Sequence, residues 1–225
     1  MNNNVSTIKP DEGVKITVAD RVFEQLSDAI ISGKIAAGSK ISEPELAKKF
    51  NVSRAPLREA IGRLEACNLV TRKPNVGARV VELSFKELIE IYRIREALEG
   101  MAARMAAENM NDEEIAQLRQ MLSEEQIGQA NESDMNHDFH YAIVQGSRNS
   151  RLNHLLCDDL YSLLRMYRMQ LGRANSQHSN ANAEHRAILD AISEHDGEMA
   201  EVMMRRHIQK SRQHIEQMFQ QQMES

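Results

Sequence analysis

Histidine is the residue type in this sequence with the widest chemical range, and it is unevenly distributed. All eight histidines of the 225-residue chain lie in the segment that begins at Asn136. The stretch NHDFH places Asn136 and His140 four residues apart, so on a helix their side chains share one face. His185 and His207 follow in two later segments with helical apolar spacing. Because a helical bundle can direct side chains from three helices to one interior point, these residues predict a metal site. Three imidazoles and one oxygen ligand suit Zn²⁺, Ni²⁺ or a similar divalent transition metal ion.

Two alternatives compete with this interpretation. In the first, the histidines bind no metal. They instead donate hydrogen bonds directly to a small organic acid bound between the helices. In the second, the histidines belong to a helical metalloenzyme, but the sequence lacks His-Glu-x-x-His, Glu-x-x-His, Gly-x-Ser-x-Gly and a glycine-rich phosphate loop. We therefore expect a protein that is not an enzyme. The remaining histidines carry no comparable signal and are expected at the surface: His137, His154, His178, His195 and His214.

Composition indicates an ordinary globular protein made of two modules. Hydrophobic residues make up 41% and charged residues 27% of the chain, which is enough for a packed core. The net charge of −5 is divided unevenly, because residues 1–83 carry 13 basic and 10 acidic residues and the remainder carries 15 and 23. A basic front and an acidic back suggest different partners. The N-terminus does not resemble a signal peptide, no membrane span is evident, and two cysteines favour a reduced compartment, so a cytoplasmic location is expected.

The front module has the element order of a winged helix-turn-helix. Residues 1–15 are polar and expected to be disordered, and the module is expected over 16–83. Helical spacing begins near Asp20, a short helix follows Ser42, and a third helix follows Ser53. Ser42, with Glu45 three residues later, and Ser53 are expected to cap these helices. Two short strands around the turn at 74–77 predict a two-stranded wing.

The third helix is expected to bind DNA because one face is apolar and the other is basic. An apolar stripe on its back allows it to pack, and Ser53, Arg54 and Arg58 lie off that stripe near its N-terminus. Backbone N–H groups and a hydroxyl there can hold phosphate, while arginine can hold phosphate or read guanine. The alternative is that these arginines lie on the solvated face of an ordinary helix and bind nothing. The wing is expected to touch the DNA backbone or minor groove through Arg72, Lys73, Asn75 and Gly77.

From Ser84 onward the sequence predicts only helices. Six segments with helical periodicity follow one another across residues 84–220, and none shows the alternation of a strand. One of these segments, 149–172, is expected to form a single helix. The fold class is therefore mainly α, with a winged helix-turn-helix of three helices plus a two-stranded wing followed by an all-α antiparallel bundle.

The front module resembles a known family of regulators. The stretch GKIAAGSKISEPELAKKFNVSRAPLREAIGRLEACNLV is similar to the DNA-binding segment of the GntR family of bacterial transcription regulators, and the likeness covers roughly residues 17–83. The resemblance implies a homodimer that binds a palindromic double-stranded operator. It also implies that Ser53, Arg54 and Arg58 match the DNA-contacting positions of the recognition helix, with Gly77 at the wing tip.

The back module resembles the FCD ligand-binding domain of the FadR subfamily. The sequence stretches that carry this resemblance are IYRIREALEGMAAR, NHDFHYAI, EHRAILDAI and MMRRHI. The resemblance implies that His140, His185 and His207 hold a metal, with Asn136 where the family usually has aspartate. It further implies a small organic acid as effector, and Arg95 of the word IREALE as a counter-charge for its carboxylate. Arg165 is a second candidate, and the alternative for Arg95 is an ion pair with Glu99.

Overall fold

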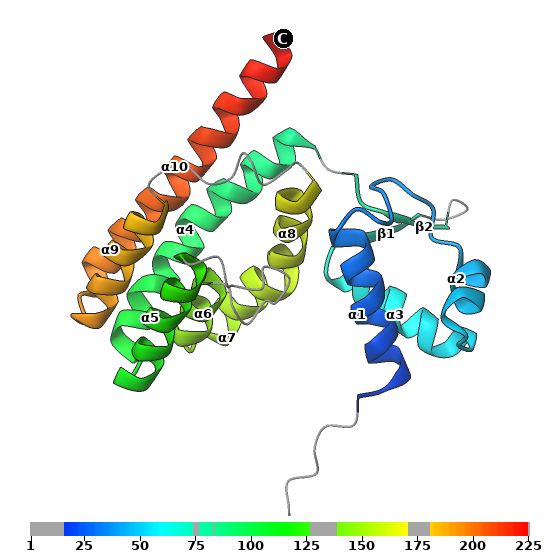
Figure 1. The fold of residues 1–225 in the computed structure, drawn as a ribbon, viewed down its shortest axis with the longest axis horizontal. Coiled ribbons are helices and arrows are strands. Elements are labelled where there is room, and N and C mark those ends of the chain that lie inside the picture. The colour runs from blue at the N-terminus through cyan, green and yellow to red at the C-terminus, as the bar shows by residue number, and fades with distance from the viewer. Residues whose placement is uncertain (1–15, 74–76, 83, 127–138, 171–180, 225) are drawn as a thin grey trace, which may run out of the picture.

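The computed structural model describes residues 16–73, 77–82, 84–126, 139–170 and 181–224. Figure 1 shows a small N-terminal unit beside a larger helical unit. The small unit comprises α1 (Val18–Ile31), α2 (Glu43–Phe50), α3 (Arg54–Ala66), β1 (Val70–Lys73) and β2 (Gly77–Val80). The helical unit comprises α4 (Phe85–Asn109), α5 (Asp112–Gln126), α6 (Phe139–Gly146), α7 (Ser150–Asn153), the π-helix η2 (His154–Leu160), α8 (Tyr161–Gln170), α9 (Ala181–Ser193) and α10 (Gly197–Glu224). The predicted mainly α fold with a two-stranded wing is confirmed.

The N-terminal unit is held together by the apolar backs of α1 and α3. Leu26 and Ile30 on α1 are completely buried, as are Leu57 and Ile61 on α3. Burying a side chain of this size stabilises the folded state by about 1.5–3 kcal/mol relative to exposure. The two strands pair antiparallel, with the register Val70↔Val80, Thr71↔Arg79, Arg72↔Ala78 and Lys73↔Gly77. α3 is therefore packed from behind, which leaves its other face exposed.

One of three serines at helix N-termini makes a capping hydrogen bond with its side chain, and two do not. The Ser84 hydroxyl accepts a hydrogen bond from the Glu87 backbone N–H at 3.2 Å and so caps α4, at the residue from which the sequence predicts helices. Ser42 and Ser53 occupy the N-cap positions of α2 and α3, but neither side chain makes a capping hydrogen bond. The capping box predicted with Glu45 is thus wrong. An N-cap side chain bonds the N–H of the second or third helical residue, and a proline removes one of those two donors in each helix.

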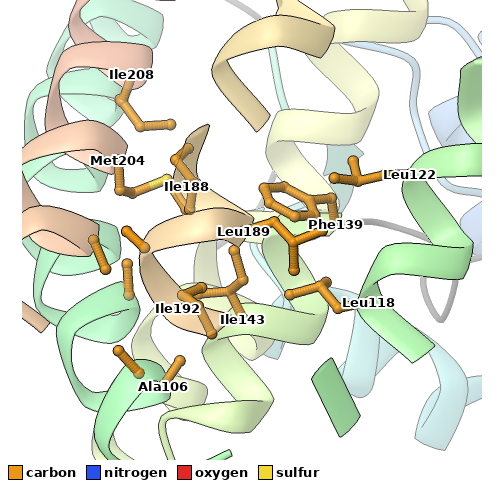
Figure 2. Packing of buried hydrophobic residues seen from close by; sticks show 14 of the residues in the cluster. Ala106, Leu118, Leu122, Phe139, Ile143, Ile188, Leu189, Ile192, Met204 and Ile208 are labelled. Atoms are coloured by element: carbon orange, nitrogen blue, oxygen red, sulfur yellow. The ribbon is translucent and has the colours of Figure 1, made fainter. Parts of the chain in front are cut away.

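The helical unit packs around the long antiparallel pair of α4 and α10. Phe85 stacks on Phe219 with ring centroids 4.0 Å apart, and Arg104 pairs with Glu201 farther along, so the two helices run in opposite directions. α5, α6 and α9 complete the core on one side of this pair. Figure 2 shows the core between them, built from Ala106, Leu118, Leu122, Phe139, Ile143, Ile188, Leu189, Ile192, Met204 and Ile208. Despite the length of α10, no helix among the described residues is long and apolar enough to cross a membrane.

Gly146 ends α6 where a side chain has no room, and this predicts a measurable effect on stability. A Cβ atom there would lie 2.6 Å from Met110 Sδ and 2.7 Å from its Cγ. Met110 is buried, so Gly146→Ala is expected to lower the free energy of unfolding by about 1–3 kcal/mol through overpacking. Gly62→Ala is the control, because nothing lies within 4 Å of its Cβ position in α3. It should gain up to about 1 kcal/mol from helix propensity. Urea unfolding of both variants provides the measurement, and equal effects would contradict the packing argument.

The segment expected to form one helix over 149–172 is interrupted. α7 gives way at His154 to seven residues of π-helix, and α8 begins at Tyr161. α8 packs on α1, and its completely buried Met166 belongs to the apolar core of the N-terminal unit. The neighbouring Tyr167 hydroxyl donates to the Ser84 carbonyl at 2.9 Å and accepts from the Ser84 N–H at 3.0 Å. Burial and the nearby Glu87 carboxylate raise the pKa of Tyr167 to about 12, against the opposite effect of the Ser84 contacts, so the hydroxyl stays protonated at neutral pH. α8 therefore connects the two units.

Candidate metal centre and nucleic-acid interface

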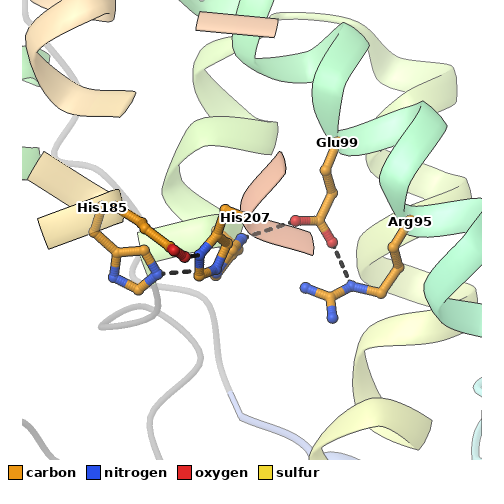
Figure 3. Close-up of polar contacts among 6 residues, drawn as sticks. Arg95, Glu99, His185 and His207 are labelled. Carbon is orange, nitrogen blue, oxygen red and sulfur yellow. Dashed lines mark hydrogen bonds and ion pairs between the residues drawn. The ribbon is translucent and has the colours of Figure 1, made fainter. Parts of the chain in front are cut away.

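Three buried histidines from three helices converge in the helical unit. The Nε2 atoms of His185 and His207 are 3.2 Å apart, and those of His207 and His140 are 3.3 Å apart. The three residues are 5–7% exposed. Their ligand atoms lie within 4.8 Å of one another, close enough to bind a single metal ion. The structure thus brings together the three histidines that the sequence singled out (Figure 3).

Each histidine takes its place because it continues an apolar stripe of its helix. His140 on α6 is followed one turn later by Ile143, and His185 on α9 by Ile188, both of which are completely buried. His207 on α10 follows Met204 by one turn, and Met204 is completely buried. Residues three or four apart share a helix face, so core packing rotates the imidazoles inward. The burial of each histidine therefore follows from its own helix, and the convergence follows from how α6, α9 and α10 pack.

Glu99 supports His140 from α4. Its Oε2 lies 2.8 Å from His140 Nδ1, and its Oε1 accepts from Arg95 Nε. Burial would raise the pKa of Glu99, but the Arg95 guanidinium and His140 outweigh it and lower that pKa to about 2. Arg95 is 2% exposed, and its guanidinium lies over the Tyr92 ring. The ion pair that competed with effector binding for Arg95 is therefore present in this structure.

Glu184 supports His207 in the same manner. Its Oε2 lies 2.8 Å from His207 Nδ1, and its Oε1 accepts from Lys210 Nζ at 2.7 Å. Figure 3 shows the Glu99 carboxylate between the histidine group and Arg95. Two of the three imidazoles are thus held by a carboxylate that is itself neutralised by a basic side chain.

The carboxylates determine where the protons of the imidazoles lie. A carboxylate can only accept, so Nδ1 of His140 and of His207 carries the proton. In the neutral ring, Nε2 then has a lone pair, and the two lone pairs face each other across 3.3 Å. Two facing lone pairs repel unless a proton or a cation lies between them. A carboxylate on the far nitrogen of a ligating histidine is the usual support of a metal site.

Sequence reasoning missed Glu184 and Lys210 and treated Glu99 only as a partner of Arg95. The one available signal was position, because Glu99 follows Arg95 by one turn and Glu184 directly precedes His185. Adjacent residues point about 100° apart on a helix, so Glu184 can reach the neighbouring α10 only when that helix lies at its side. The sequence predicted two further residues for this site, Asn136 and Arg165. Asn136 lies outside the described residues, and Arg165 is a partly buried residue of α8.

Among the histidines expected at the surface, the structure describes three. His154 and His195 are exposed, and His214 is half-buried. His195 also lies with its Nδ1 2.7 Å from the Ala107 carbonyl oxygen, which joins the end of α9 to α4. His137 and His178 lie outside the described residues.

The predicted DNA-binding residues of α3 lie together at its exposed N-terminal end. Ser53, Arg54 and Arg58 are all exposed, and the Ser53 hydroxyl is not used for capping. Arg58 Nε donates to Glu43 Oε2 of α2 at 2.8 Å, and this contact raises the pKa of Arg58. The first-turn N–H groups, the hydroxyl and the two guanidinium groups form a surface that suits phosphate and base edges.

The wing places two more cations at the edge of the N-terminal unit. Arg72 and Lys73 are exposed on β1, and Arg72 Nε lies 3.7 Å from Glu65 of α3. Gly77 begins β2 opposite Lys73 with a φ of 87°, a conformation that favours glycine. Asn75 lies outside the described residues. The described part of the wing therefore has the charge expected for contact with a nucleic-acid backbone.

Two family models match the chain, one for each unit. The model described as bacterial regulatory proteins, gntR family, matches residues 18–80. The model of the FCD domain matches residues 90–210. The two matches meet near the start of α4, where the wing ends and the bundle begins.

Curated relatives align with most of the chain. A probable D-xylose utilization operon transcriptional repressor from Paenarthrobacter nicotinovorans is 30% identical over 198 residues, which cover 86% of this chain and 87% of that protein. The uncharacterized HTH-type transcriptional regulator YdhC of Bacillus subtilis is 29% identical over 199 residues, covering 86% of this chain and 88% of that protein. Both are named as transcriptional regulators, in agreement with the expectation that the chain is not an enzyme.

Solved structures show the same fold. McbR/YncC of E. coli superposes with a TM-score of 0.71 at 23% identity, covering 91% of this chain and 99% of that one. A putative GntR regulator from Rhodococcus sp. RHA1 superposes with a TM-score of 0.68 at 24% identity, covering 88% and 96%. At these identities the likeness concerns the fold of both units.

Proposed function

Because the chain is a GntR-family transcription regulator with a C-terminal FCD domain, we propose that it binds a palindromic operator as a homodimer under the control of a small carboxylate. In this proposal a divalent transition metal at His140, His185 and His207 holds the carboxylate. The observation that carries it is the convergence of three Nε2 atoms, two of them on imidazoles whose Nδ1 is engaged by a carboxylate.

The distances between the histidine nitrogens fit one metal ion. Two nitrogens bound to the same Zn²⁺ at about 2.0–2.1 Å with a tetrahedral angle are about 3.3 Å apart. The observed separations are 3.2 Å and 3.3 Å. Three neutral imidazoles suit Zn²⁺ or Ni²⁺. When bound, the metal would supply a fixed positive charge and coordination positions beyond the three histidines.

The charges around the site favour an anionic effector. Glu99 is matched by Arg95 and Glu184 is matched by Lys210, and an imidazole that ligates a metal does so in its neutral form. A divalent ion bound there would add two positive charges that these ion pairs, among the described residues, do not cancel. A buried charge is costly unless it is paired, so a carboxylate bound to the metal is stabilised. Arg95 is a further cation close to the site, although it is already paired with Glu99.

In this proposal α8 transmits a conformational change from the effector domain to the DNA-binding unit. The helix carries Arg165, the second predicted effector contact, directly beside Met166 in the N-terminal core and Tyr167 at Ser84. It follows a π-helix, a geometry that often occurs at functional sites. An effector that shifts α8 would therefore move α1 and with it the recognition helix. In a homodimer this changes the spacing of two recognition helices, which must match half-sites about one helical turn apart.

Metal removal provides the test of this function. We expect at least one acid from a panel of small hydroxy- and ketocarboxylic acids to change operator affinity by about 5- to 150-fold, the usual range of allosteric coupling. The change should require metal. Affinity is measured by fluorescence anisotropy with metal-loaded and chelator-stripped protein, on a duplex that the native protein selects from a random library. An acid that acts equally on both forms would favour the metal-free pocket, and a panel without effect would contradict carboxylate control.

Asn136→Asp is expected to tighten metal binding. Position 136 precedes His140 by one helical turn, and aspartate would add a negatively charged oxygen ligand where asparagine offers a neutral one. Competition with a chromogenic chelator measures the affinity. Gln209→Glu is the control, because it adds the same charge at an exposed position of α10 close in sequence to His207. Affinity that is unchanged, or raised equally by both variants, would remove residue 136 from the ligand set.

A further inference from the structure

The two arginines of the recognition helix are held differently, although both are exposed. Arg58 is anchored through its Nε to Glu43 at 2.8 Å. Arg54, one turn earlier, makes no hydrogen bond or ion pair with any residue that the structure describes. Both carry the same charge, so the difference lies in how many arrangements each guanidinium can adopt before DNA arrives.

Glu43 is built into the junction of the two helices of the motif. It is the first residue of α2, and its side chain is 26% exposed, against 62% for Arg58. An exposed ion pair of this kind adds little to folding stability. The carboxylate also lies beside the surface expected to face DNA, where a negative charge by itself repels phosphate. A negative charge in the first turn of α2 suits the helix dipole, but this does not require contact with Arg58, and general attraction to DNA does not account for the carboxylate.

We propose that Glu43 is a positioning residue that orients the Arg58 guanidinium for binding to guanine. The carboxylate occupies Nε, so the two terminal nitrogens are left as a fork with a restricted orientation. A fork of two N–H donors matches the O6 and N7 acceptors of guanine in the major groove. An arginine that is already held loses less rotamer freedom on binding. Arg54, which lacks such an anchor, then serves as a phosphate contact that carries no base preference.

This inference rests on the proposed role of Arg58 in operator binding, and the experiment separates the two. The probe is a duplex that the native protein selects from a random library, together with copies in which each guanine is replaced by adenine or by 7-deazaguanine. The guanine read by Arg58 is the one whose replacement weakens the native protein but not Arg58→Ala. We expect a native preference of about 10- to 100-fold at that position.

Glu43→Ala should reduce the preference at that guanine several-fold and leave the preferences at other positions unchanged. Glu43→Gln should be intermediate, because its amide oxygen still accepts from Nε without the charge. Glu45→Ala is the matched control, since Glu45 lies in the same turn, is exposed and contacts no described residue. Glu45→Ala should raise affinity for all duplexes slightly and keep the guanine preference. Thermal unfolding of each variant verifies the fold, and Glu43→Gln serves if the alanine variant is unstable.

The outcomes separate the role of Arg58 in operator binding from the positioning role of Glu43. If Arg58→Ala binds the selected duplex normally, the proposed role of Arg58 fails. If Arg58 is required but no guanine preference depends on it, or if Glu43→Ala retains that preference, only the positioning role of Glu43 is overturned. Equal effects of Glu43→Ala and Glu45→Ala would likewise overturn it, because they would indicate a general charge effect.

Discussion

Arg58→Ala is expected to abolish specific operator binding while leaving the fold and the metal content of the protein unchanged. The side chain is 62% exposed and its one described ion pair, with Glu43, lies at the surface, so its removal leaves the core intact. A good bidentate arginine–base contact is worth about 1–3 kcal/mol. A homodimer loses it at both half-sites, and the combined loss of about 2–6 kcal/mol weakens binding by roughly 30-fold to more than 10⁴-fold.

The matched control for Arg58→Ala is Arg151→Ala. Arg151 is an exposed arginine of α7 in the helical unit, so the variant loses the same charge away from the recognition helix. Electrophoretic mobility shift on the selected duplex and on a scrambled duplex, at two salt concentrations, separates sequence readout from phosphate attraction. We expect Arg151→Ala to bind like the native protein. Native affinity of Arg58→Ala for the selected duplex would rule out the assigned recognition surface.

His140→Ala is expected to remove the metal from the helical unit. Untagged native protein should contain about one equivalent of a transition metal by elemental analysis, and the variant should contain almost none, because one of three protein ligands is lost. His154→Ala is the control, since His154 is exposed and pairs with Asp158 outside the cluster. Glu99→Gln should retain the three ligands but bind metal about 10- to 100-fold more weakly, as other outer-shell substitutions do.

A second measurement keeps this prediction testable if a variant folds poorly. A metal that binds only the folded state raises its stability, by about 2.7 kcal/mol at a hundredfold excess over Kd. Addition of Zn²⁺ should therefore raise the melting temperature of the native protein and of His154→Ala, but not that of His140→Ala. A native protein without metal, even after purification with metal supplied, would contradict the metal centre. The histidine cluster would then be a hydrogen-bonding pocket, with Arg95 as the first anchor to test.

Local patterns in the sequence were sufficient to predict the DNA-binding unit. The stripe that contains Leu57 and Ile61 determined which face of α3 is buried, and so which face carries Arg54 and Arg58. The register of a helix face depends only on residue spacing, which the sequence displays directly. The capping errors at Ser42 and Ser53 had the opposite origin. There the N-cap residue was identified correctly, but a proline had removed one of the two backbone donors available to its side chain.

The candidate metal centre was only partly predictable, and the limit is physical. Sequence spacing and family resemblance identified His140, His185 and His207, and the structure shows that each continues the buried face of its own helix. The carboxylates that orient two of them come from other parts of the bundle, and Glu99 meets His140 across 41 positions of the chain. Such a contact depends on how far one helix slides and rotates against another, and that is decided by the packing of many side chains together. The sequence by itself therefore determined the fold class and the faces of the helices, whereas only the tertiary structure decided which charges meet at the site.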